Sequence, residues 1–104
     1  MGTENSTSIG TEIDIVTKHG DEYDLYEIKT ALDIRLCIRE ALSQLLEYGL
    51  YRTDIKVRNY YIVGSIVLTD DARNYLNALR KKYHIPVNYI QVDAENEIHE
   101  YKLI

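Results

Sequence analysis

The chain has 104 residues and a formal net charge of −5, and 45 % of its residues are apolar while 28 % are charged. This length allows one compact domain and excludes two that fold independently. No stretch approaches the roughly eighteen apolar residues of a membrane span, and the first residues lack the basic start and apolar run that are typical of a signal peptide. A single cysteine, Cys37, excludes an internal disulfide framework. We therefore expect a small cytoplasmic domain without a membrane partner.

The negative charge and the tyrosine content bear on the partners of the domain. Nucleic-acid-binding domains usually carry a basic surface, because neutralising phosphates supplies much of their affinity. An acidic domain can act on DNA through a local basic patch, a bound metal or a larger assembly. The ten tyrosines, with no Phe and no Trp, suit a thin core with wet edges. Stacking on nucleic-acid bases is the alternative role for them.

The N-terminal third of the chain predicts a polar lead-in and a β-hairpin. Residues 1–10 are small and polar without periodicity, so a single domain is expected over residues 11–104. Residues 11–17 and 23–30 alternate in polarity as strands do. Between them, Gly20-Asp21 suits a two-residue type II′ turn, which has Gly at its first central position.

This hairpin register places acidic and basic side chains opposite one another. Asp14 faces Glu27, and Glu12 faces Lys29. Opposed side chains share a face of the sheet, with Cβ atoms about 4.5–5.5 Å apart. The spacing therefore predicts that two carboxylates and a lysine lie together.

A helix is expected next, because Thr30 and Asp33 have the spacing of a capping box and Tyr48-Gly49 supplies a stop. Apolar residues at helical spacing predict its buried stripe: Ile34, Ile38, Ala41, Leu42 and Leu45. At 100° per residue, one flank of the stripe carries Cys37, Gln44 and Tyr48, and the other carries Arg35 and Arg39.

The second half of the chain predicts one more helix among three strands. Residues 57–68 contain a continuous apolar run typical of a strand buried on both faces. Thr69-Asp70-Asp71 opens a helix that ends before Pro86. Its expected inner face consists of Ala72, Tyr75, Leu76, Leu79 and Tyr83. Residues 87–92 and 98–104 are the last strands, paired across a polar turn. The order ββαβαββ predicts an α/β sandwich around a mixed central sheet.

The residues brought together by the hairpin suit phosphodiester hydrolysis. Proteins hold Mg²⁺ through one or two carboxylates, while substrate phosphate and water complete its coordination. A lysine beside the metal can orient the attacking water and stabilise charge that develops at phosphorus. Asp14, Glu27 and Lys29 supply these groups.

Asp14 followed by Glu27-Ile28-Lys29 resembles the Asp…Glu-x-Lys signature of the PD-(D/E)XK superfamily, and Gln44 with Tyr48 resembles the Gln-x-x-x-Tyr extension of some members. The resemblance implies a restriction-endonuclease-like fold and a nuclease that uses Mg²⁺ or Mn²⁺. It also implies nucleic acid as the partner, with DNA expected, in repair or in defence against invading DNA. Ile13 stands where many members have proline, and the first ten residues leave almost no room for the helix that usually precedes the first strand.

The resemblance also implies roles for individual residues. Asp14 and Glu27 would ligate the metal, and the backbone carbonyl of Ile28 would add a further ligand. Lys29 would assist the water. Gln44 and Tyr48 would lie over the site and position the lysine or the substrate.

Other interpretations of the same residues remain open. A nuclease-fold module with weak or no activity, which serves binding or assembly, is the alternative function. Glu27 and Lys29 can be a solvated strand face, with Glu12–Lys29 as an ion pair worth under about 1 kcal/mol. Gln44 and Tyr48 can form a hydrogen bond on the flank of a helix.

Two further expectations concern partners. Arg35 and Arg39 are like charges at i, i+4, which predicts an anionic partner, either phosphate of a nucleic acid or a neighbouring acidic side chain. A sheet left partly uncovered predicts a homodimer or a place in a larger nuclease assembly.

Overall fold

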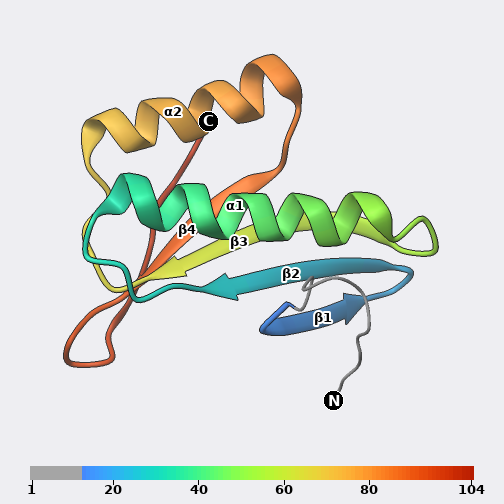
Figure 1. Ribbon diagram of the computed structural model, residues 1–104, viewed down its shortest axis with the longest axis horizontal. Helices are drawn as coiled ribbons and strands as arrows, with labels where there is room; N and C mark the ends of the chain where they lie inside the picture. Colours follow the sequence, from blue (N-terminus) through green and yellow to red (C-terminus); the bar gives the residue numbers. More distant parts are fainter. Residues whose placement is uncertain (1–12) are drawn as a thin grey trace.

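The computed structural model describes residues 13–104, which form a five-stranded sheet and two helices (Figure 1). The elements are β1 (Ile15–His19), β2 (Glu22–Ile28), α1 (Ile34–Tyr51), β3 (Lys56–Gly64), α2 (Asp70–Tyr83), β4 (Val87–Val92) and β5 (Ile98–Glu100). The predicted α/β class and the order ββαβαββ are confirmed. The expected lead-in over residues 1–10 and the expected partner of Lys29, Glu12, lie outside the described residues.

The N-terminal hairpin has the predicted register. Strands β1 and β2 are antiparallel, with His19 opposite Glu22 and Ile15 opposite Tyr26, so Gly20-Asp21 is the two-residue turn. Gly20 has φ +66°, a left-handed conformation that glycine adopts without steric cost. Strand β1 begins later than predicted, at Ile15, and Asp14 lies immediately before it.

The sheet has the strand order β1-β2-β3-β4-β5. The three central strands, β2, β3 and β4, are parallel, and the edge strands β1 and β5 are antiparallel to their neighbours. Helix α1 connects β2 to β3, and α2 connects β3 to β4. Because both connections run in the same direction across the sheet and such crossovers are right-handed, both helices cover the same face (Figure 1). The fold therefore has two layers, and within residues 13–104 no helix covers the second face.

The core lies between the helices and the sheet. The predicted stripe of α1 is buried in full, and it packs with Leu25, Ile62, Val87 and Tyr89 of the sheet. On α2, Ala72 and Leu76 are buried, but two tyrosines predicted for its inner face are not. Tyr75 is 51 % exposed and Tyr83 is 68 % exposed, because Tyr75 lies at the side of the buried stripe through Ala72 and Leu76, and Tyr83 is the last residue of the helix.

The burial of strand β3 differs from the prediction. It was expected to be buried on both faces, but its buried residues alternate with half-buried ones. Tyr60, Ile62 and Gly64 lie under the helices, while Tyr61 and Val63 face the uncovered side. The continuous apolar run therefore marks a strand with one buried face and one apolar, partly exposed face.

Helix α1 is shifted relative to the prediction at both ends. Its N-cap is Asp33, whose side chain accepts hydrogen bonds from the backbone N–H groups of Arg35 and Leu36, so Thr30 precedes the helix. The helix continues through Gly49 to Tyr51. Gly49 is a packing residue, because a Cβ there would lie 2.8 Å from the hydroxyl of Tyr60.

The C-terminal segment leaves the sheet early. Strand β5 ends at Glu100, although residues 98–104 were predicted to be extended. The hydroxyl of Tyr101 donates to Gln91 and accepts from the backbone N–H of Leu68. The backbone N–H of Ile104 donates to Asn77 of α2. These contacts turn the chain end toward α2.

In the described part of the chain, no helix is long and apolar enough to cross a membrane.

Candidate active site

Asp14 and Glu27 meet at the edge of the sheet, where β2 ends. The backbone N–H of Asp14 lies 3.4 Å from Oε1 of Glu27, and the backbone N–H of Ile28 donates to Oδ2 of Asp14 at 2.8 Å. Glu27 is only 3 % exposed, whereas Asp14 is exposed to solvent. One carboxylate is thus buried under α1, and the other lies at the solvent side of the same site.

Lys29 links this carboxylate to the helix above. Lys29 directly follows β2, and its backbone N–H still donates to the carbonyl of Val63, so strand alternation puts Lys29 on the same face as Glu27. The ammonium nitrogen of Lys29 lies 3.3 Å from Oε2 of Glu27 and donates a hydrogen bond to the side-chain oxygen of Gln44. Gln44 reaches the lysine because it lies on the flank of α1 that faces the β1–β2 edge. The structure therefore brings Asp14, Glu27, Lys29 and Gln44 together.

The two carboxylates of Asp14 and Glu27 outnumber the one ammonium group of Lys29 at this site. Burial raises the pKa of Glu27, and the negative charge of Asp14 raises it further. The hydrogen bond and the charge of Lys29 act in the opposite direction but do not cancel the increase. Ionised Glu27 is therefore held at a cost that a second positive charge would relieve.

The backbone of Ile28 faces the same edge as Asp14. In a β-strand the N–H and C=O of one residue point to the same side, as the exchanged hydrogen bonds of antiparallel pairs require. Since the N–H of Ile28 donates to Asp14, its carbonyl is expected on the Asp14 side of β2. Two carboxylates and one carbonyl suit Mg²⁺, which takes few protein ligands. Within residues 13–104 no group of three His, Cys, Asp or Glu side chains could hold a metal.

Tyr48 has a different partner from the one the resemblance implies. It lies one turn beyond Gln44 on α1, and its hydroxyl accepts a hydrogen bond from Arg52 at 3.0 Å. The Arg52 guanidinium also lies 5.4 Å from the centre of the Tyr48 ring. Among the described residues, no hydrogen bond joins Tyr48 to Lys29 or Gln44.

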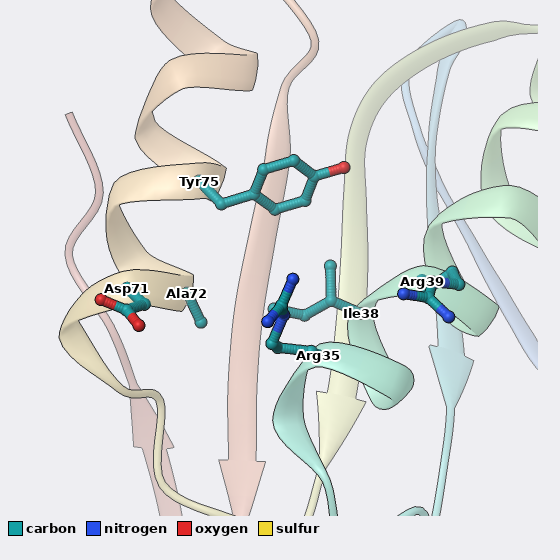
Figure 2. A pocket seen from close by; sticks show the side chains of 6 residues that line it. All are labelled: Arg35, Ile38, Arg39, Asp71, Ala72 and Tyr75. Atoms are coloured by element: carbon teal, nitrogen blue, oxygen red, sulfur yellow. The ribbon is translucent and has the colours of Figure 1, made fainter.

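Arg35 and Arg39 lie apart from the carboxylates, on the other flank of α1. Both line a cavity of about 440 Å³ between α1 and α2 (Figure 2). The structure brings the two arginines together with each other and with residues of α2, but not with Asp14 or Glu27. Their predicted contact with nucleic acid remains a prediction.

One polar cluster was not predicted from the sequence. Asp24 is only 2 % exposed although it lies on the uncovered face of the sheet, and Arg58 binds both of its oxygens, at 2.7 and 3.1 Å. Asn59 and His19 lie within 3.4 Å of the same carboxylate. Burial alone would raise the pKa of Asp24, but Arg58, with Asn59 and His19, outweighs it and holds this pKa below its ordinary value.

The sequence carries a weak signal for this cluster. Asp24 interrupts the face of β2 that also carries Tyr26 and Ile28, and a lone carboxylate among apolar neighbours needs a partner. Its partner was not predictable, because the β2–β3 register shifts at Tyr23/Asp24. The shift allows Arg58, an extra residue on β3, to reach Asp24.

Comparisons of the chain with protein-family models, with curated proteins and with solved structures found no match.

Proposed function

We propose that this chain is a metal-dependent nuclease domain of the restriction-endonuclease-like type, which hydrolyses phosphodiester bonds of nucleic acid, with DNA as the expected substrate. The observation that carries the proposal is the buried carboxylate of Glu27, placed beside Asp14 and held by Lys29, which is itself held by Gln44. An Asp, Glu and Lys at the end of one hairpin are the groups that this chemistry requires.

The residues fit Mg²⁺ or Mn²⁺ for two reasons. The raised pKa of Glu27 reflects negative charge in a partly dry place, and a divalent cation would offset it. The described contacts of Asp14 occupy its Oδ2 atom, which leaves Oδ1 for a ligand. A bound Mg²⁺ would supply Lewis acidity and a nucleophilic water at neutral pH.

The chain's own residues would orient the reaction. Gln44 holds the ammonium of Lys29 beside Glu27, so the positive charge lies next to the buried carboxylate. From there Lys29 would hold the attacking water and stabilise the negative charge of the pentavalent phosphorus. Asp14, at the solvent side, would face the incoming phosphate together with the Ile28 carbonyl.

The first test is thermal stability with and without Mn²⁺. A ligand that binds only the folded state stabilises it by RT ln(1 + [L]/Kd), about 2.7 kcal/mol at a hundredfold excess over Kd. The wild-type protein should therefore melt several degrees higher in millimolar Mn²⁺. Asp14→Asn and Glu27→Gln should abolish the shift. Glu47→Gln, a matched change at an exposed position of α1, should preserve it.

The second test is cleavage of labelled single- and double-stranded DNA and RNA with Mg²⁺, Mn²⁺ or EDTA. Lys29→Ala should retain the Mn²⁺-dependent melting shift and lose cleavage, because Lys29 acts in the chemistry and not in ligation. Wild-type protein that neither cleaves nor responds to metal would refute the proposal and favour a binding or assembly module. A Lys29→Ala variant that cleaves like wild type would refute the role of the lysine.

A further inference from the structure

The cavity between α1 and α2 combines positive charge with apolar surface. Its volume is about 440 Å³, within the range of pockets that hold small organic ligands. Ile38 and Ala72 contribute apolar surface, and Arg35, Arg39 and Tyr75 project around them (Figure 2). These five residues come from two helices whose relative position is fixed by the sheet below them.

The two cavity arginines differ from all other arginines of the chain. There are six arginines, all within residues 13–104, and four donate side-chain hydrogen bonds to protein oxygens: Arg52, Arg58, Arg73 and Arg80. In that same part of the chain no hydrogen bond or ion pair is formed by the side chain of Arg35 or Arg39. Because they repel each other at i, i+4, they suit an anionic ligand that lies between them.

Asp71 is the acidic residue that lines the cavity, and it does not neutralise the arginines. No ion pair within 4 Å joins Asp71 to either arginine in the described structure, and Figure 2 shows its carboxylate on the side of α2 turned away from Arg35. Asp71 lies in the first turn of α2, where the helix dipole favours a negative charge. Within residues 13–104, no acidic side chain forms an ion pair with Arg35 or Arg39.

Tyr75 gives the cavity an aromatic wall. It was predicted to lie in the core, yet its ring projects from α2 toward α1, across the space above Arg35, and is half exposed (Figure 2). An exposed flat ring beside two cations matches a ligand that joins a planar ring to a phosphate. Base–aromatic stacking and phosphate–arginine contacts are two of the interactions by which proteins bind single-stranded nucleic acid.

We propose that this cavity binds one nucleotide of a single-stranded nucleic acid, with its phosphate on Arg35 and Arg39 and its base on Tyr75. A base within a duplex would have to be unpaired and unstacked before it entered the cavity, whereas a single-stranded base would not, so a single strand is favoured. The inference rests on the proposed function in taking nucleic acid as the ligand, and it narrows the substrate to a strand with an unpaired segment. Gln44 lies on the opposite flank of α1, so a strand crossing this helix would pass from the cavity toward Asp14 and Glu27.

Binding of a 5′-phosphorylated thymidine tetranucleotide to the full chain in EDTA tests the site, with NMR titration as the measurement. The double variant Arg35→Ala/Arg39→Ala should weaken binding at least about tenfold. Tyr75→Ala should weaken it roughly tenfold, and Tyr75→Phe should retain it, because stacking needs only the ring. Lys81→Ala/Lys82→Ala removes the same charge from exposed positions at the far end of α2 and should change the affinity less than about threefold.

Three outcomes would overturn the inference. Equal losses in the arginine and lysine double variants would mean that only net charge matters. Tighter binding of a hairpin duplex that holds the same four thymidines in base pairs would exclude an unpaired base in the cavity. Full competition by inorganic phosphate with no effect of Tyr75→Ala would reduce the site to a simple anion site.

The binding assay in EDTA is independent of the cleavage assay. Arginine-dependent binding without cleavage in any metal would support the cavity site and count against the nuclease. Cleavage with binding that is indifferent to Arg35 and Arg39 would support the nuclease and refute the cavity site.

Discussion

At the scale of single residues, Glu27 is an ionisable group whose surroundings disfavour its charged form. A glutamate on the helix-facing side of β2 loses most of its hydration, and Lys29 compensates this loss only in part. Buried charges of this kind reduce stability unless a specific partner is present. A buried carboxylate that is only partly compensated is typical of a site that binds a cation, where function and not stability favours the charged residue.

The pH dependence of stability tests this interpretation of Glu27. Because the pKa of Glu27 in the folded protein is raised above its ordinary value of 4.5, its contribution to stability is fully present below that value and is lost as the pH rises through the folded pKa. In EDTA, Glu27→Gln should therefore be more stable than wild type at pH 7, and the difference should disappear near pH 4. Urea denaturation of both proteins across this range measures it, and parallel curves would contradict the prediction.

At the scale of elements, the hairpin could be predicted in register because its signals are local. Gly20 fixes a two-residue turn, and alternation then determines which residues face each other. That is why Asp14, Glu27 and Lys29 could be placed together from the sequence. Helical periodicity placed Gln44 on one flank of the buried stripe, but its place beside Lys29 was expected only from the resemblance to the Gln-x-x-x-Tyr extension.

The predictions that failed depend on contacts that periodicity does not encode, some between elements and one within the first turn of a helix. Periodicity shows that Tyr75 lies on the same side of α2 as Leu76, but not how far the core extends beneath that side. The N-cap is Asp33 and not Thr30, because the side chain of Asp33 accepts hydrogen bonds from two backbone N–H groups of the first turn. The partner of Asp24 depends on a register shift between parallel strands, for which no local signal exists.

Gly49 is the clearest case in which packing overrides a local signal. In an exposed helix, Gly→Ala stabilises by about 1 kcal/mol. Here the new Cβ would lie 2.8 and 2.9 Å from Oη and Cε1 of buried Tyr60, and such overpacking typically costs 1–3 kcal/mol. We predict that Gly49→Ala lowers the free energy of unfolding by about 1 kcal/mol.

Chemical denaturation of Gly49→Ala, of Tyr60→Phe and of the double variant provides the control. Tyr60→Phe removes the nearer of the two close contacts, so Gly49→Ala should cost less in that background than in wild type. An increase in stability for Gly49→Ala alone would show that Gly49 acts as an ordinary solvent-facing helix residue.

At the scale of the whole molecule, the helices of residues 13–104 cover one face of the sheet and leave the other uncovered, and that second face is apolar at its centre. Strand pairing places Ile15 beside Tyr26 and Val92 beside Ile98 on it. The rings of Tyr26 and Tyr61 stack there with centroids 4.6 Å apart. Half-buried Val63 and Ile90 continue the surface across the parallel strands. A contiguous apolar surface of this kind marks an interaction site more often than free surface.

We predict that two copies of the chain associate through this uncovered face. A twofold interface uses the same surface on both copies, so one substitution at its centre acts twice. Ile90→Lys would place two ammonium groups in an apolar contact and should weaken the dimer at least about tenfold, since unpaired charges are costly when buried. Leu50→Lys, which changes a 70 % exposed residue near the end of α1, should leave association unchanged. Sedimentation velocity from low to high micromolar concentration measures both variants against wild type.

A wild-type protein that stays monomeric at high micromolar concentration would exclude this dimer. A dimer that tolerates Ile90→Lys would place the interface on another surface, such as the outer strand β1 or β5.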